Sequence, residues 1–374
     1  MNYREGNKIF CRECKKERNK ACNRAETEVN KDMKIVGICD AYVRPEHMEE
    51  LKKVTDNPIE IYDNPELATE EQTAKVMLKT EQQGPESFPA DEKLMEAVKD
   101  ADIIVVHMSP INRAVIDAAK NLKLVAVLRG GCDSVNVAYL NQKGIPVVNA
   151  PWRSANAVAD FAVGMILCEM KNIARGHHGI LTGQWIKNYA NSYDIHDLRK
   201  QRIGIIGFGY IGQRVAQRLK GFESEIVVYD PFMKKEVIEG MGYQFVSEDE
   251  LLKTADIVTL HLRLSESTKD YLNREKIAKM KSTAILVNTS RAGLIEENAL
   301  LDALKTKAIK GAALDVFNQE PLPEDNEYVK LDNVTMTPHI AGVSNDTFST
   351  SIEIVAEELE RYFRGEELRC RVKE

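Results

Sequence analysis

Three glycines at a fixed spacing form the clearest chemical signal in the sequence, G-F-G-Y-I-G at 207–212. They follow an apolar run at 203–206 and precede a helical run at 213–220. In such a motif the glycines permit a tight turn, a close approach of the backbone to a pyrophosphate, and close packing of helix on strand. The helix N-terminus then offers unpaired N–H groups to the phosphates. The motif predicts a dinucleotide site made by Gly207, Gly209, Tyr210, Ile211 and Gly212.

An acidic residue, Asp230, ends the next strand-like run at 225–230. A carboxylate there can accept hydrogen bonds from the ribose hydroxyls and repels a 2′-phosphate, which favours NAD over NADP as the cofactor. Three nearby cations keep NADP as the alternative: Lys234, Lys235 and Arg263.

Short apolar runs alternate with helical runs on both sides of this motif. The runs are apolar throughout, which is typical of strands buried on both faces of a parallel sheet. Helices are expected at 92–99, 112–120 and 346–363. The expected strands are 33–39, 102–106, 123–128 and 145–149 in the first half, then 202–209, 225–230, 256–262, 283–289, 310–317 and 334–338.

The position of the glycine motif defines the expected domain order. A long apolar stretch at 154–175 reads as one helix buried between two lobes, and a loop with Gly183-Gln184-Trp185 follows it. We expect an α/β fold of two doubly wound lobes. A Rossmann cofactor domain (154–340) would be inserted into a flavodoxin-like substrate domain (33–153 plus 341–374), with crossings at the long helix and at 340–346.

The composition excludes several classes of protein. The 374 residues are 43% hydrophobic and 29% charged, with a formal net charge of −7. No window reaches the roughly 18 apolar residues of a membrane span. An acidic chain without a basic tract is a poor nucleic-acid binder. The odd number of cysteines, seven, indicates reduced thiols, and no secretory signal is visible, so we expect a cytoplasmic protein.

Residues 1–32 are rich in charged side chains and poor in apolar ones, which predicts a flexible tail. Cys11, Cys14 and Cys22 offer a zinc site as an alternative. A closed structural zinc site needs four ligands, and no histidine precedes His47. We therefore expect no metal.

Five blocks in a fixed order carry a family resemblance over roughly residues 33–374. They are L-R-G-G-C-D-S-V-N at 128–136, the glycine motif with its strand at 204–212, V-N-T-S-R-A-G at 287–293, A-L-D-V-F-N-Q-E-P-L at 313–322 and T-P-H-I-A-G at 337–342. With these blocks the chain resembles the D-isomer-specific 2-hydroxyacid dehydrogenases, which include phosphoglycerate dehydrogenases and glyoxylate reductases. One departure is Ala292, where the family commonly has glycine.

The resemblance implies an NAD-dependent oxidoreductase that interconverts a small D-2-hydroxy acid and its 2-keto acid. It implies three catalytic residues, Arg291, Glu320 and His339. Histidine titrates near neutrality and suits proton transfer, a neighbouring carboxylate orients it, and a planar guanidinium suits a substrate carboxylate. Each of them taken singly could be an ordinary loop or surface residue.

The resemblance implies further contacts. Thr289, Ser290, Asp315 and His339 would lie near the nicotinamide. The bare amides of Arg129-Gly130-Gly131 would hold the substrate carboxylate, as the family's matching loop does. Apart from the resemblance, His107, Ser109 and Asn112 stand in the preceding loop and would read the far end of the substrate. Cys132 beside that loop reads as a packing residue.

Two kinds of question stay open from the sequence. Some family members are nucleotide-sensing corepressors, so a binding protein is an alternative; a formate or phosphite enzyme is another, although formate enzymes carry glutamine where Glu320 stands. Whether the substrate is phosphorylated, and which direction prevails, is undecided. A homodimer built through the cofactor domain is expected, with the loop after Gly183 wrapping the partner.

Overall fold

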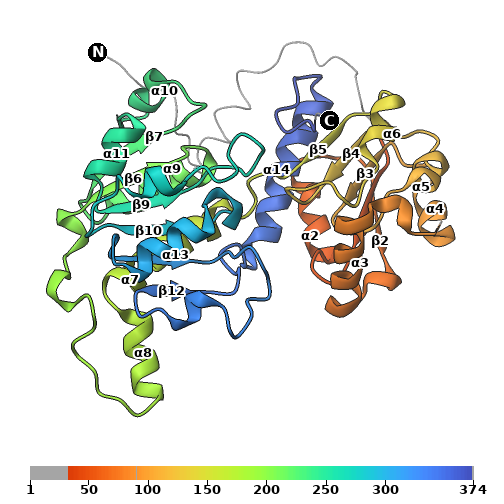
Figure 1. Ribbon diagram of the computed structural model, residues 1–374. Coiled ribbons are helices and arrows are strands. Elements are labelled where there is room, and N and C mark those ends of the chain that lie inside the picture. Colours follow the sequence, from red (N-terminus) through yellow and green to blue (C-terminus); the bar gives the residue numbers. More distant parts are fainter. Residues whose placement is uncertain (1–32, 90, 373–374) are drawn as a thin grey trace. The chain divides into compact units, whose positions relative to one another are not determined.

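The computed structural model describes residues 33–89 and 91–372, and the chain divides into two compact units. Unit 1 joins the residues up to Pro151 to those from Ser351 onward, and unit 2 is Trp152–Thr350 (Figure 1). The predicted tail and its three cysteines lie outside the described residues.

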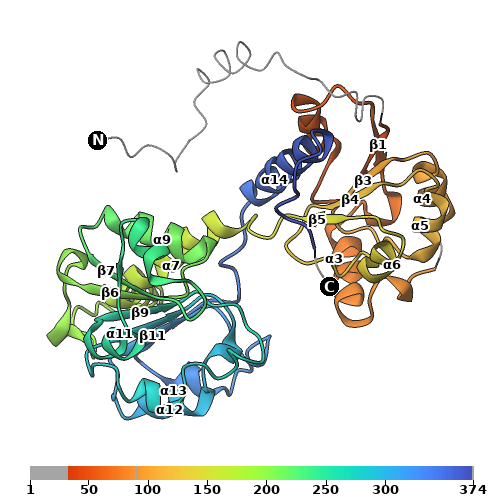
Figure 2. The same ribbon diagram turned by 90° about the horizontal axis from the view of Figure 1, so that it is seen from above.

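Unit 1 is built on a parallel five-stranded sheet of order β2-β1-β3-β4-β5. The side chains of β1, β3 and β4 are buried throughout, because helices cover both faces of the sheet (Figure 2). The strands are β1 (Ile35–Cys39), β2 (Ile59–Asp63), β3 (Ile103–Val106), β4 (Leu124–Val127) and β5 (Val147–Asn149); the helices are α2 (Pro45–Glu49), α3 (Glu70–Gln83), α4 (Glu92–Val98), α5 (Arg113–Ala118) and α6 (Val137–Gln142).

Unit 2 carries a parallel seven-stranded sheet of order β12-β11-β10-β9-β6-β7-β8. Both strand orders are those of doubly wound sheets, flavodoxin-like in unit 1 and Rossmann in unit 2, as predicted. The strands are β6 (Arg202–Ile206), β7 (Glu225–Tyr229), β8 (Gln244–Phe245), β9 (Ile257–Leu260), β10 (Ile285–Asn288), β11 (Gly311–Leu314) and β12 (Val334–Met336); the helices are α7 (Ala155–Met170), α8 (Ile173–Leu181), α9 (Tyr210–Lys220), α10 (Lys235–Gly240), α11 (Glu248–Thr254), α12 (Arg274–Ile277) and α13 (Glu297–Lys305).

The prediction of one helix over 154–175 was wrong, because the stretch forms two helices, α7 and α8. Asn172 between them has a left-handed backbone with φ of 57°. Arg175 of α8 stabilises the break. It donates to both carboxylate oxygens of buried Glu169, at 2.8 and 3.0 Å, and to Asn172 Oδ1. α7 packs on α9 and on β10, β11 and β12, all within unit 2.

Helix α14 (Asp346–Phe363) follows its predicted bounds and ends before Gly365, whose φ is 63°. The second boundary between units lies inside this helix, at 350/351, rather than at 340/341. Residues 340–342 belong with unit 2, because the N–H groups of Ile340 and Ala341 donate to Asp315 and Gly342 lies against Ser154. Among the described residues, no helix combines the length and apolarity that crossing a membrane would require.

Candidate active site

The glycine motif forms a tight turn between β6 and α9. Gly207 has φ of 93°, and a Cβ there would lie 2.7 Å from the carbonyl carbon of His261. A Cβ on Gly212 would lie 2.1 Å from the Gly207 oxygen. A Cβ on Gly209 would meet nothing within 4 Å. Two glycines are therefore required by packing, while Gly209 leaves an open approach to the backbone.

The N-terminus of α9 faces this open space. Its N-cap is Gly209, which supplies no side-chain hydrogen bond. The ring of Tyr210 stacks on Trp152 with 4.1 Å between ring centroids, and Ile211 packs against the core of unit 2. The backbone N–H groups of this first turn are thus what the helix presents to an anion.

Asp230 follows β7 and braces the motif. Its Oδ2 accepts from Phe208 N at 2.6 Å, and its Oδ1 accepts from Phe232 N and Met233 N at 2.7 and 2.9 Å. Each carboxylate oxygen has about two lone-pair sites, so Oδ2 keeps capacity for one more donor. The same carboxylate can therefore shape the turn and accept from a ribose hydroxyl.

Two buried polar atoms at the carboxyl ends of β9 and β10 have no hydrogen-bond partner among the described residues: His261 Nδ1 and Thr289 Oγ1. Burial lowers the pKa of His261 to about 3, so its imidazole is neutral. Beside them Ser290 Oγ donates to Leu260 O at 2.7 Å. Buried polar groups usually have a hydrogen-bond partner, so a water or a bound ligand can supply one at these two atoms.

Arg291 lies in the loop after β10, and the buried Asn288 shapes that loop. Asn288 Nδ2 donates to Arg291 O at 2.9 Å, and its Oδ1 accepts from Ser290 N at 3.0 Å. The exposed guanidinium donates through Nη1 to Ser290 O at 2.7 Å. An arginine has five N–H donors, so most of its fork stays available to a carboxylate.

His339 and Glu320 meet at the ends of the neighbouring strands β11 and β12. His339 Nδ1 lies 2.8 Å from Glu320 Oε2, and both side chains are partly exposed. Glu320 Oε1 accepts from Phe317 N at 2.9 Å. His339 has an uncommon left-handed backbone, with φ of 54°.

The surroundings of Glu320 keep it ionised. Burial would raise the pKa of its carboxyl, but the hydrogen bonds from His339 and from Phe317 N outweigh burial. The charges of His339 and Arg291 act in the same direction, so the pKa of Glu320 lies below its usual value. The predicted catalytic trio therefore gathers at one sheet edge.

Asp315, the predicted nicotinamide contact, is bound by three groups of the loop that carries His339. Its Oδ1 accepts from Thr337 Oγ1 at 2.6 Å and from Ile340 N at 3.0 Å, and its Oδ2 accepts from Ala341 N at 2.8 Å. The carboxylate is fully buried and spans both sides of the His339 loop. It braces the backbone from which the imidazole extends.

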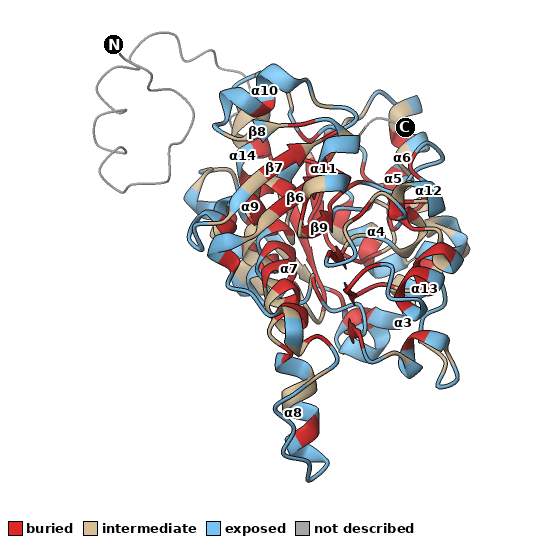
Figure 3. Ribbon diagram, turned by 60° about the vertical axis from the view of Figure 1, so that its left-hand side comes forward, coloured by how far each residue is buried: buried red, intermediate tan, exposed pale blue. Residues whose placement is uncertain are grey.

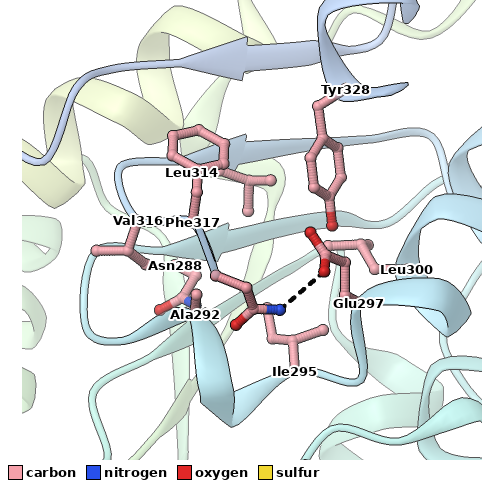
Figure 4. Close-up of a pocket in the computed structure, with 10 residues that line it drawn as sticks. Asn288, Ala292, Ile295, Glu297, Leu300, Leu314, Val316, Phe317 and Tyr328 are labelled. Atoms are coloured by element: carbon pink, nitrogen blue, oxygen red, sulfur yellow. Dashed lines mark hydrogen bonds between the residues drawn. The ribbon is translucent and has the colours of Figure 1, made fainter. Parts of the chain in front are cut away.

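A small cleft of about 260 Å³ lies behind these loops (Figure 4). Asn288 lines it from the end of β10, Ala292 from the loop after β10, and Phe317 from the loop after β11. Asn318 donates to Glu297 Oε2 at 2.9 Å across it. Arg291, Glu320 and His339 are not among its lining residues.

In unit 1 the predicted substrate loop follows β4. Gly130 and Gly131 are exposed, and among the described residues none accepts from their N–H groups. Asn149 Nδ2 donates to Gly130 O at 2.6 Å, which fixes the peptide. Cys132 packs against the core of unit 1, and burial raises the pKa of its thiol to about 11, so it is no nucleophile.

His107 is buried rather than open to a ligand. Only 1% of its side chain is exposed, and its Nδ1 lies 2.9 Å from Asp40 Oδ2. Arg129, the first residue of the loop, is 12% exposed and pairs with Glu81 at 3.3 Å. A direct contact between His107 and a substrate, as the sequence predicted, has no support in this arrangement.

Residues 163–341 match the family model described as "D-isomer specific 2-hydroxyacid dehydrogenase, NAD binding domain". A glyoxylate reductase of Korarchaeum cryptofilum is 37% identical over 283 residues, which cover 75% of this chain and 85% of that protein. The chain belongs to this family. It is on that ground an NAD-dependent oxidoreductase of the D-2-hydroxyacid dehydrogenase type.

A second curated relative and a solved structure are also similar to the chain. A D-3-phosphoglycerate dehydrogenase of Methanocaldococcus jannaschii is 41% identical over 277 residues, or 74% of this chain. The chain spans 52% of that longer protein. The crystal structure of the TT0316 protein from Thermus thermophilus has a TM-score of 0.64 at 28% identity and covers 91% of this chain and all of that one.

The residues of this dehydrogenase fit the dinucleotide of its family. The uncapped end of α9, the open space above Gly209, and the orphaned hydroxyl of Thr289 are places that a bound dinucleotide would complete. Among the described residues, no group of three or more His, Cys, Asp or Glu side chains could hold a metal ion.

Sequence reasoning missed several residues that shape the site. Asn288 holds the Arg291 loop, Thr337 binds Asp315, and Asp40 pairs with His107. The sequence could have predicted the role of Asn288, because it stands in the same block as Arg291. It could not predict the partners of Asp315 and His107, because those partners are far from them in the chain.

Proposed function

We propose that the protein interconverts a small D-2-hydroxy acid and its 2-keto acid, with a His339–Glu320 proton relay and Arg291 as the carboxylate anchor. The observation that carries this proposal is the 2.8 Å contact between His339 Nδ1 and Glu320 Oε2. It lies at the carboxyl edge of the sheet that also bears the dinucleotide motif, which is the edge where ligands of open α/β sheets bind.

The contact assigns the two ring nitrogens of His339. Because Nδ1 faces Glu320, Nε2 is the atom that passes a proton to the carbonyl oxygen in reduction and takes it back in oxidation. Glu320 holds the ring in that orientation and stabilises its protonated form. The brace from Asp315 fixes the loop beneath the ring.

Arg291 supplies a positive charge for the carboxylate of the substrate. Its free N–H donors can bind a carboxylate in a fork and polarise the adjoining carbonyl. The exposed N–H groups of Gly130 and Gly131 in unit 1 suit a carboxylate as well. NAD supplies the hydride acceptor or donor in this chemistry.

The assembly we propose is a homodimer of a cytoplasmic protein. α8 and the segment after it project from unit 2 (Figure 3) and expose large apolar side chains, Leu181 at 72% and Trp185 at 80%. Ile180 and Tyr193 add to this arm. Large exposed apolar side chains on a projecting arm suit a second copy of the chain. The four described cysteines are free thiols, which supports the location.

An oxidation assay of NADH tests the proposal against a panel of 2-keto acids that includes glyoxylate, pyruvate and hydroxypyruvate. We expect turnover of at least one, with NADH preferred over NADPH. Binding of NADH without turnover of any panel member would instead support the nucleotide-binding class of the family.

A further inference from the structure

We infer that the substrate carries no phosphate at the end remote from its 2-keto acid group, because acidic side chains outnumber basic ones at the described ligand-binding edge of unit 1 and the arginine of its substrate loop is paired with a carboxylate. The inference rests on the proposed function and adds a substrate class to it. The relatives named above act on both kinds of substrate, by their names, so similarity alone does not decide between them.

The relevant edge is defined by the strand order. In β2-β1-β3-β4-β5 the order reverses between β1 and β3, and ligands of such sheets bind outside the carboxyl ends of the strands at that point. The loops that follow β1, β2, β3 and β4 contain no lysine and two arginines, Arg44 and Arg129. They also contain Asp40, Glu66 and Asp133.

The histidine at this edge is compensated by a carboxylate. His107 Nδ1 lies 2.9 and 3.2 Å from the two oxygens of Asp40, and both side chains are 1% exposed. Burial would raise the pKa of Asp40, but the hydrogen bond and charge of His107 lower it, and so do the N–H groups of Tyr42 and Val43. Whether or not the ring is protonated, the pair adds no net positive charge.

The arginine of the substrate loop is compensated in the same way. Arg129 Nη2 lies 3.3 Å from Glu81 Oε1 on α3, and Nη1 lies 3.2 Å from Met108 Sδ. Arg44 is exposed and donates from Nε to the neutral carbonyl oxygen of Ala41, so within the described part of the chain its charge is not paired with a carboxylate. Exposed carboxylates at the end of β2, Asp63 and Glu66, belong to the same edge.

The helix N-termini at this edge are also satisfied from within the chain. Arg113 N, at the start of α5, donates to the Glu86 carboxylate at 2.9 Å, and Asn136 Nδ2 donates to the same oxygen. The Thr69 capping box and two glutamates occupy the first turn of α3. The Asn136 side chain caps α6. A carboxylate already stands where α5 would attract a phosphate.

These charges decide between two matched substrates. A phosphate monoester carries about −1.5 to −2 charge near neutral pH and is bound by arginine forks, lysines or open helix ends. At this edge a phosphate would lie near more acidic than basic side chains, which would repel it. A neutral hydroxymethyl or methyl group, or a hydrogen, faces no such repulsion.

Hydroxypyruvate and its 3-phosphate ester test the inference, because they differ only in the phosphate. With NADH in excess, we expect kcat/KM for hydroxypyruvate to exceed that for the ester by about tenfold or more, mainly through KM. A smaller ratio, or preference for the ester, overturns the inference and leaves the proposed function standing. Turnover of neither, nor of glyoxylate, by protein that binds NADH overturns both.

A single substitution tests the charge argument itself. Glu81→Gln removes the carboxylate that compensates Arg129, and we expect kcat/KM for the ester to rise about threefold, with hydroxypyruvate changed less than twofold. Glu71→Gln on the same helix is the control, because Glu71 pairs with Lys75 instead. If Glu81→Gln and Glu71→Gln leave the ester equally poor, the charge argument is wrong.

Discussion

At the scale of single residues, the site depends on contacts made across neighbouring strands. His339 and Glu320 stand nineteen residues apart in the chain, yet their side chains meet because β11 and β12 are adjacent. The sequence could predict this meeting, since both residues follow strands of one parallel sheet.

The charge of Glu320 should set the pH dependence of the reaction. Burial would raise the pKa of Glu320, but hydrogen bonds and neighbouring charges lower it, so its carboxylate stays ionised into the acid range and remains paired with His339. In Glu320→Gln that charge is absent at every pH. We therefore expect the pH profiles of kcat/KM for reduction and for oxidation to differ from those of the wild type. Profiles of kcat/KM against pH that superimpose on those of the wild type would exclude the relay.

Other residue-scale contacts could not be predicted. Asp315 binds Thr337, Ile340 and Ala341, and Asp40 binds His107 over a separation of 67 residues. Nothing local in the sequence marks these pairs, because the folded chain creates them. The burial of His107 against Asp40 could not be foreseen for this reason.

At the scale of elements, apolar runs in the sequence predicted the buried strands. They did not reveal strands that are short or only partly buried. β2, with the sequence I-E-I-Y-D, is an edge strand of intermediate burial, and β8 has two residues. The break at Asn172 was missed because helical periodicity continues across it. It is fixed by the Glu169–Arg175 pair, which joins the two consecutive helices across the break.

The turn before α9 gives a direct test of the dinucleotide element. Gly212→Ala would place a methyl group 2.1 Å from Gly207 O, so the turn must shift and NADH binding should weaken by about a hundredfold or more. Gly240→Ala is the control, because its Cβ would meet nothing within 4 Å. Fluorescence titration of NADH measures both. Equal affinity in the two variants would show that Gly212 is not required.

The pair at the root of α8 gives a test of stability. Glu169 is 1% exposed, so Arg175→Ala leaves a buried carboxylate without its partner, at a cost of about 3–5 kcal/mol in the unfolding of unit 2. Arg199→Ala, which removes an exposed pair with Glu223, should cost less than about 1 kcal/mol. Denaturant unfolding measures the two. Equal losses would contradict the assigned role.

At the scale of the whole molecule, the projecting arm predicts the assembly. Leu181→Asp with Trp185→Ala should convert a dimer into a monomer at micromolar concentration, because the arm would lose its largest apolar groups. Leu78→Asp, an exposed leucine on α3, should leave the mass unchanged. Light scattering after size exclusion gives the masses. A monomeric wild type would contradict the proposal.

The most direct test of the central claim is the kcat of His339→Asn with NADH and the best 2-keto acid of the panel. Asparagine tolerates the left-handed backbone at this position, so the loop should keep its shape. We predict that kcat falls by about a hundredfold or more while the Kd for NADH, set by the separate glycine turn, stays within about twofold. A variant that retains near-normal kcat would show that His339 does not carry the proton.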